Sequence, residues 1–227
     1  MITKKEAGGW NMKKLYLIGD SIRMGYAAYV KQALRGIAEV YWPEENCRFA
    51  AYTYYSLGDW EAQLRVGEDC DVVHWNVGLH DVIRFTGDEP VSTPEIYGYY
   101  VERICRHLPF YYPRAKQVFA TSTPIVEDRH SFWINRKNED IRRYNQVALE
   151  TLSKYDVAIN DLHRVISAAP IVVFTDHAHL YTPLGRELTV CAVLRSVCPY
   201  LGVRFEDLTL PNFQEDIQEL SERQVLA

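Results

Sequence analysis

Two short segments at opposite ends of the chain carry side chains suited to nucleophilic catalysis. The first is Gly19-Asp20-Ser21, which follows the apolar run LYLI and precedes a helical pattern. A serine at such a junction lies at a helix N-terminus, where free N–H groups can stabilise an oxyanion that forms beside its own Oγ. Asp and Ser are also common helix N-caps, so this segment alone leaves both interpretations open.

The second segment is Asp176-His177-Ala178-His179, shortly before the last helical pattern. A serine hydroxyl becomes nucleophilic when a base takes its proton, and a carboxylate usually holds that base in one tautomer. At a spacing of three on a loop, Asp176 can reach Nδ1 of His179 while Nε2 faces the serine. Two alternatives remain open, namely a metal site formed by His177, His179 and Asp176, or an aspartate that only caps the following turn.

Two further segments place glycine beside polar residues. SLGD (56–59) follows the second apolar run, and GLHD (78–81) follows the third. Because glycine lets backbone N–H groups approach a ligand closely, either segment could supply donors to an oxyanion. Each is also an ordinary strand-to-helix turn.

Short apolar runs alternate with amphipathic helical patterns along the chain. The expected strands are 15–19, 38–42, 71–78, 116–122 and 157–161, and the expected helices are 22–34, a short helix after Gly58, 94–107, 139–155 and 183–197. Strands that are apolar nearly throughout imply a sheet covered on both faces, and intervening helices imply parallel pairing. We therefore predict a flavodoxin-like three-layer α/β/α sandwich around a mostly parallel five-stranded sheet, with the ligand site outside the carboxyl ends of the strands.

Length and composition are those of a folded protein with one large domain. The chain has 227 residues, of which 48% are hydrophobic and 24% charged. A net charge of -5 argues against nucleic acid as a partner. We expect an N-terminal extension (1–13), a catalytic domain (14–202) and a C-terminal tail (203–227) that packs on the domain or on a partner.

Two further features bear on the compartment. No apolar run is long enough for a signal peptide or a membrane span, so we expect a cytoplasmic protein. The five cysteines are scattered without paired spacing, so we expect buried thiols rather than a disulfide framework. The sequence leaves the oligomeric state open.

Taken together, the four polar segments resemble the motifs of the SGNH/GDSL hydrolase family. GDS, SLGD and GLHD follow three successive strands, and DHAHLYTPLG (176–185) resembles the family pattern D-x-x-H-L-x-x-x-G. The resemblance spans most of the chain, from Lys14 to Leu201. It implies the family fold and a serine ester hydrolase, with Ser21 as nucleophile, His179 as base and Asp176 as the partner of that base. It also implies that no metal or organic cofactor is needed.

One position departs from the family pattern. The resemblance implies oxyanion donors from the N–H groups of Ser21 and Gly58, and a third donor from the asparagine of a G-x-N-D block. Here the third segment carries His80 instead. An imidazole N–H can donate as an amide does, so we expect His80 to be the third donor, with Asn76 as the alternative.

For the substrate we expect a small-molecule or carbohydrate ester, with an acetyl group on a carbohydrate as the preferred case. Amphipathic aromatic side chains can bind sugars, and Trp60 directly follows the second segment. Arg129, His130 and Trp133 lie in a long connection after the fourth strand, where they could contact the substrate. Two alternatives remain open, namely a lipase- or thioesterase-like acylhydrolase and a binding module that keeps the fold but turns over slowly.

Overall fold

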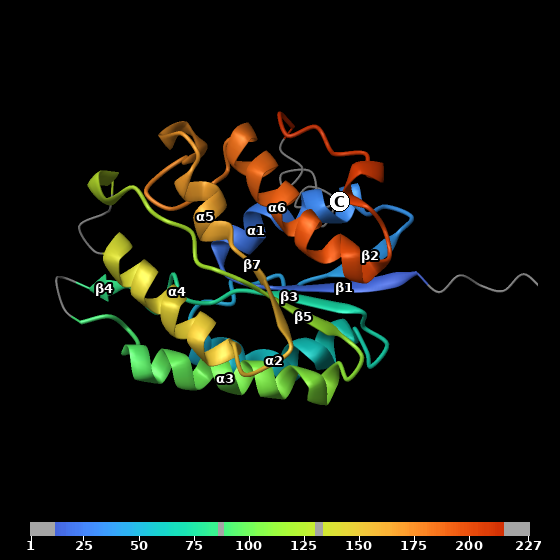
Figure 1. Cartoon of the computed structure of the whole chain (residues 1–227), viewed down its shortest axis with the longest axis horizontal. Helices are drawn as coiled ribbons and strands as arrows, with labels where there is room; N and C mark the ends of the chain where they lie inside the picture. The colour runs from blue at the N-terminus through green and yellow to red at the C-terminus, as the bar shows by residue number, and fades with distance from the viewer. Residues whose placement is uncertain (1–11, 86–88, 130–133, 216–227) are drawn as a thin grey trace, which may run out of the picture.

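The chain forms a central parallel sheet with helices on both faces (Figure 1). The computed structural model describes residues 12–85, 89–129 and 134–215. The sheet has the strand order β2-β1-β3-β5-β7, and all of its pairings are parallel. Its strands are β1 (Lys13–Ile18), β2 (Ala38–Tyr41), β3 (Val72–Trp75), β5 (Lys116–Ala120) and β7 (Val157–Asn160). The predicted three-layer α/β/α fold is confirmed.

Burial on both faces explains the apolar strands. Leu15 to Ile18 in β1 and all four residues of β3 have no exposed surface. On adjacent strands, the rings of Trp75 and Phe119 meet edge to face with centroids 4.8 Å apart. Such a sheet excludes water from both sides, which is why its central strands read as continuous apolar runs.

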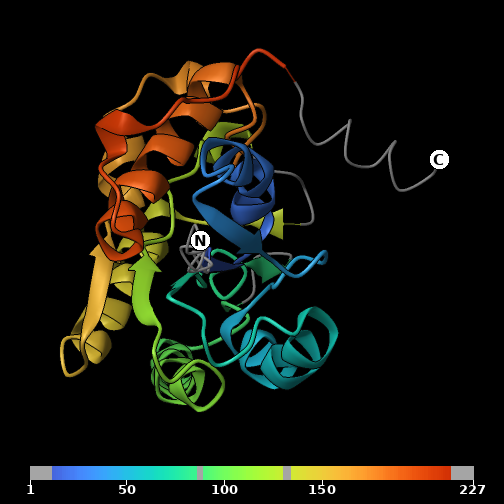
Figure 2. The same cartoon turned by 90° about the vertical axis from the view of Figure 1, so that its right-hand side faces the viewer.

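Six helices of the described chain form the two outer layers. α1 (Ser21–Ala33), α5 (Leu162–Ser167) and α6 (Pro183–Leu201) cover one face, and α2 (Ala50–Leu64), α3 (Pro94–Tyr111) and α4 (Asn138–Leu152) cover the other (Figures 1 and 2). β2 is added beside β1 on one side of the sheet, and β5 and β7 are added beside β3 on the other side. The direction of the strand order changes between β1 and β3, and ligands of such open parallel sheets bind outside the carboxyl ends of the strands at this point.

Several elements differ from the sequence-based expectation. The predicted short helix after Gly58 is wrong, because α2 already begins at Ala50. The side chain of Asp81 accepts the Ala50 N–H, and this contact from a distant segment caps the helix where its own sequence offers no capping residue. Other elements were not predicted, namely α5, a short antiparallel pair of β4 (Arg84–Phe85) with β6 (Ile134–Asn135), and the 3₁₀ helices η1 (Glu127–Arg129), η2 (Ile171–Val173) and η3 (Phe205–Asp207).

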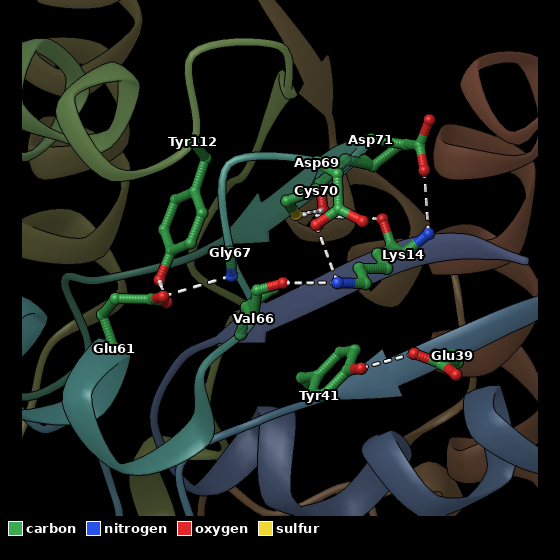
Figure 3. A network of polar contacts seen from close by, with 11 residues as sticks. Lys14, Glu39, Tyr41, Glu61, Val66, Gly67, Asp69, Cys70, Asp71 and Tyr112 are labelled. Carbon is green, nitrogen blue, oxygen red and sulfur yellow. Dashed lines mark hydrogen bonds and ion pairs between the residues drawn. The ribbon is translucent and has the colours of Figure 1, made fainter. Parts of the chain in front are cut away.

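A polar network fixes β1 against the chain that leads into β3, near the amino ends of both strands (Figure 3). Lys14 Nζ donates to the Val66 carbonyl at 2.8 Å and to Asp69 Oδ1 at 2.7 Å. The Lys14 N–H donates to Asp71 Oδ2 at 2.9 Å. These contacts fix how β1 pairs with β3. The same pairing sets the positions of the residues that follow the carboxyl ends of the two strands, Gly19 and Asn76.

The described part of the tail, residues 203–215, packs on α1 and α6. The Tyr29 hydroxyl donates to the Glu215 carbonyl at 2.7 Å, and the Tyr29 and Phe213 rings lie 5.8 Å apart. The Arg195 guanidinium lies 3.8 Å from the centre of the Phe205 ring.

Two further observations concern the cysteines and the helices. All five cysteines are free, and four of them are buried. Among the residues that the structure describes, no helix combines the length and the apolar character that crossing a membrane requires.

Asp81 makes stability depend on pH. It is fully buried, and burial raises its pKa to about 7, although the Ser92 hydroxyl and the Ala50 N–H favour the charged form. Between about pH 4 and 7, the Asp81 carboxyl is therefore protonated in the native state and ionised in the unfolded state. This stabilisation is complete below about pH 4 and disappears as the pH rises through about 7, a change of up to roughly 4 kcal/mol.

We expect Asp81→Asn to remove this dependence, since asparagine cannot ionise. Between about pH 4.5 and 7.5 the free energy of unfolding of Asp81→Asn should rise relative to wild type, by about 2 to 4 kcal/mol. Urea unfolding across this range measures the difference, with the exposed Glu68→Gln as a carboxylate control. Parallel curves for wild type and Asp81→Asn would contradict the expectation.

Candidate active site

Ser21 is the first residue of α1 and lies at the carboxyl end of β1. Asp20 caps the helix, with Oδ1 accepting the Ile22 N–H at 3.0 Å. Asp20 is fully buried, and its Oδ2 has no hydrogen-bond partner in the described chain. The Ser21 N–H is one of the unpaired donors of the first helical turn.

The ends of β1 and β3 approach closely beside Ser21. A Cβ at Gly19 would lie 2.1 Å from Asn76 Oδ1 and 2.8 Å from the Arg23 Cβ, so only glycine fits there. The Asn76 N–H donates to the Ile18 carbonyl at 3.1 Å and continues the pairing of the two strands. The Asn76 amide therefore lies against the backbone two residues before Ser21.

The structure brings Ser21, His179 and Asp176 together. His179 Nε2 lies 2.9 Å from Ser21 Oγ, and His179 Nδ1 lies 2.6 Å from Asp176 Oδ2. With Asp176 ionised, Nδ1 donates to its carboxylate, so Nε2 carries the lone pair that accepts the serine hydroxyl. The spacing of the two segments predicted this relay.

The loop that carries the relay is held by Asp176 itself. Its Oδ1 accepts the N–H groups of Ala178 and His179 at 2.8 and 2.9 Å. Burial alone would raise the pKa of Asp176, but these N–H groups and the His179 ring outweigh it and lower the pKa to about 2. Asp176 is therefore a carboxylate at any pH at which the protein is studied.

Tyr181 aligns the His179 ring. The two rings are stacked with centroids 4.9 Å apart, and the Tyr181 hydroxyl donates to the Ser21 carbonyl at 2.7 Å. Gly25 makes room for this arrangement, because a Cβ there would lie 2.4 Å from Tyr181 Cε1. Tyr181 thus couples the position of the imidazole to the helix that carries the serine.

The connection between β2 and α2 lies against the same junction. The Cys47 N–H and Arg23 Nη2 donate to the Gly19 carbonyl at 3.1 and 3.2 Å, and Arg23 Nη2 also donates to the Glu45 carbonyl. Arg48 follows with a φ of 52°, a left-handed conformation that is unfavourable for a residue other than glycine. The sequence did not point to this loop, because glycine was the signal for backbone N–H groups near a ligand and residues 42–49 contain no glycine.

Gly58 and Trp60 lie elsewhere, and both expectations are corrected. Gly58 is inside α2, about 12 Å along the helix from Ala50, and a Cβ there would meet the Tyr111 hydroxyl at 2.9 Å. Its N–H therefore belongs to the helix rather than to a turn beside Ser21. Trp60 is 1% exposed on the inner face of α2, and its Nε1 donates to Glu45 Oε1 at 2.8 Å, so it cannot line a substrate pocket.

His80 and Asn76 occupy different positions relative to the nucleophile. His80 lies in the turn after β3, and burial lowers its pKa, an effect that Asp20 opposes and that the charge of Arg136 reinforces. Asn76 directly follows β3, contacts Gly19, and makes no side-chain hydrogen bond with any described residue. Asn76 therefore contacts the backbone before Ser21, and His80 lies close enough for Asp20 and His179 to act on its pKa, so both remain candidates for the third donor.

The structure adds Arg136 to the site. This arginine directly follows β6 and is buried. Its Nε donates to the Leu79 carbonyl at 2.6 Å, and its Nη1 donates to His177 Nε2 at 2.9 Å. It therefore links the turn after β3 with the loop that carries the relay. No sequence signal pointed to it, because it is a single arginine outside the recognised motifs.

Of the remaining sequence candidates, the structure describes only Arg129. Arg129 ends η1 and is exposed, while His130 and Trp133 lie outside the described residues. Within the described ranges, no group of three or more His, Cys, Asp or Glu side chains is arranged to hold a metal ion.

We expect Gly25→Ala to misalign the relay. The added methyl group must displace the Tyr181 ring, so His179 should take the serine proton less effectively and Ser21 should react with a fluorophosphonate at least about tenfold more slowly. Gly98→Ala in α3 is the matched control, since its Cβ meets only side-chain atoms of α4. If Gly25→Ala and Gly98→Ala react with the fluorophosphonate at the same rate, Tyr181 does not position His179.

The chain is similar in structure to several solved proteins, although its sequence matches no family model. No protein-family model and no curated protein matches the sequence. A lipase/acylhydrolase from Enterococcus faecalis matches with a TM-score of 0.66 at 17% identity, over 88% of this chain and 99% of that chain. An acetyl xylan esterase matches with a TM-score of 0.64 at 18% identity, over 81% and 99%. A GDSL-like lipase from Bacteroides thetaiotaomicron matches with a TM-score of 0.61 at 11% identity, over 82% and 87%. The chain therefore has the fold of the SGNH/GDSL hydrolases.

Proposed function

We propose that the protein is a serine ester hydrolase that removes small acyl groups, with an acetyl group on a carbohydrate as the preferred substrate. The observation that carries the proposal is the relay itself, with 2.9 Å between Ser21 and His179 and 2.6 Å between His179 and Asp176. Both distances suit hydrogen bonds through which a proton can move. The fold shared with esterases and lipases supports the same chemistry by analogy.

In the first half of the reaction, Ser21 Oγ attacks the ester carbonyl carbon while His179 Nε2 takes the hydroxyl proton. The carbonyl oxygen becomes an oxyanion, and Asp176 stabilises the imidazolium. The tetrahedral intermediate then collapses. Its bond to the alcohol oxygen breaks, His179 gives its proton to the leaving alcohol, and the acyl group stays on Ser21.

In the second half, water replaces the alcohol. His179 takes a proton from the water as its oxygen attacks the acyl carbon, and the second intermediate releases Ser21 Oγ. The proton on Nε2 returns to the serine, and the free acid leaves. The reaction needs only water as co-reactant.

Two donors are suited to the oxyanion. The Ser21 N–H lies at the start of α1, where the helix dipole also favours negative charge. The Asn76 side chain lies against Gly19, and its Oδ1 has no hydrogen-bond partner in the described chain, so the N–H groups of its Nδ2 are the donors that it would offer to a ligand. His80 is the alternative third donor.

The exposure of the relay supports a substrate that extends into solvent. The His179 and Asp176 side chains are 29% and 47% exposed, so the site lies near the surface. The alcohol part of an ester can then be large, as in an acylated carbohydrate. The acetyl xylan esterase among the similar structures supports the same substrate class, whereas the buried Trp60 does not contribute to it.

Substitutions in the relay test the proposal with p-nitrophenyl acetate. Wild type should release nitrophenol, and Ser21→Ala should abolish the excess over background. Asp176→Asn should lower kcat by roughly 10³- to 10⁴-fold, because the amide can neither keep the tautomer nor stabilise the imidazolium.

The control for Asp176→Asn is Asp161→Asn, which changes another aspartate that accepts a backbone N–H group, at the start of α5, and should stay within about twofold of wild type. Equal rates for wild type and Ser21→Ala would favour a binding module over an enzyme.

Substitutions of the two donor candidates decide between them. Asn76→Ala should lower kcat by about 10²- to 10³-fold, as expected for one oxyanion donor, and His80→Ala by less than about tenfold. Because the Asn76 side chain leaves no partner in the described chain unsatisfied, its removal should change the urea midpoint little. If His80→Ala is the slower variant and His80→Asn restores its rate, the donor is His80.

A further inference from the structure

Arg136 is a buried cation with neutral acceptors on one side of its guanidinium. The residue is 7% exposed. Nε donates to the Leu79 carbonyl at 2.6 Å and Nη1 to His177 Nε2 at 2.9 Å. A guanidinium carries five N–H donors. Three of them remain, and Nη2 has no hydrogen-bond partner among the residues described.

No described carboxylate forms an ion pair with Arg136. Burial lowers the pKa of Arg136, and the charges of Asp20 and Asp176 oppose this effect from beyond ion-pair distance. Asp20 caps α1 and Asp176 is bound to His179, so each carboxylate is held at its own place. A buried cation without a counter-ion is strongly unfavourable, and an anionic ligand would relieve that cost.

The contacts of Arg136 connect it to the two loops that carry His80 and His179. Leu79 directly precedes His80, and His177 is two residues from His179. The charge of Arg48, at the left-handed position after β2, acts on His80 together with that of Arg136. Two guanidinium groups from different loops therefore contribute positive potential at this part of the site.

We propose that Arg136 binds a carboxylate of the substrate, so that the preferred substrates are acyl esters that carry a negative charge on their alcohol or acyl part. This inference rests on the proposed hydrolysis at Ser21 and adds the charge of the substrate. The free N–H groups on Nη1 and Nη2 lie in one plane and can bind both oxygens of a carboxylate.

Two pairs of substrates of matched size separate charge from shape. 4-Acetoxybenzoate and 4-acetoxybenzamide differ in charge on the alcohol part, and mono-p-nitrophenyl adipate and p-nitrophenyl hexanoate differ on the acyl part, with a chain too long for the carboxylate to attack its own ester. Each kcat/KM is divided by the rate of the same ester in alkaline buffer, which removes differences in intrinsic reactivity. We expect the anion to be preferred by about 10- to 100-fold in at least one pair, and the preference to fall with added salt.

Variants assign the preference to Arg136. In Arg136→Met the ratio of anionic to neutral substrate should fall close to one, and in Arg136→Lys part of it should remain. The ratio is measured within each variant, so a general loss of activity cancels. Arg143→Gln on the exposed side of α4 is the charge control and should keep the wild-type ratio.

The outcomes separate this inference from the proposed function. If wild type hydrolyses the neutral esters through Ser21 but shows no preference in either pair, the inference is overturned and the function stands. If Ser21→Ala leaves the rates on all four esters unchanged, both are overturned. A preference that persists in Arg136→Met also overturns the inference. Should Arg136→Met fail to fold, the wild-type ratio and Arg136→Lys decide.

Discussion

The hydrogen bond between His179 Nε2 and Ser21 Oγ joins side chains that are 158 residues apart in sequence. Its 2.9 Å length requires that two independent loops be fixed to within fractions of an ångström. The sheet fixes the first, since β1 is paired on both sides and ends at Ile18, three residues before the serine. Local bonds fix the second, including the one from the Thr175 N–H to the His179 carbonyl at 2.9 Å. Tyr181 then connects the two loops.

Asp176 beside this bond is ionised, whereas burial lowers the pKa of the neighbouring histidines His80 and His74. Asp176 stays ionised, with a pKa of about 2, next to His179. The other histidines near the centre resist charge, because burial lowers the pKa of His80 and lowers that of His74 to about 3. His74 is bonded to the Tyr26 hydroxyl and the Asn160 amide and has a structural role. The ionised carboxylate of Asp176 is therefore the charged group that adjoins the His179 ring.

Much of this arrangement could be predicted from the sequence, because it depends on local patterns. The apolar runs predicted all five strands of the central sheet, and alternation with helical patterns predicted their parallel order. Ser21 and the spacing of Asp176 and His179 predicted the relay. These features follow from burial, from helix capping and from the reach of a side chain on a short loop.

What could not be predicted depends on contacts between distant segments. α2 starts at Ala50, where Asp81 caps it, so Gly58 lies inside this helix and not in a turn, and the Cys47 loop that contacts Gly19 has no glycine to mark it. Asn76 was ranked below His80 because only the structure shows which of them touches Gly19. Arg136 has no local signature, since its role comes from two loops that meet around it.

The proposed hydrolysis requires that the hydroxyl of Ser21 carry the acyl group during turnover. The most direct measurement is peptide mass spectrometry on enzyme quenched with acid while it hydrolyses an acetyl ester. Trypsin releases residues 15–23, LYLIGDSIR, in which Ser21 is the only serine. The account predicts one acetyl group on this peptide at Ser21 in the quenched sample and none before substrate is added. Turnover without acetylation of this peptide, or acetylation at another residue that tracks turnover, would contradict it.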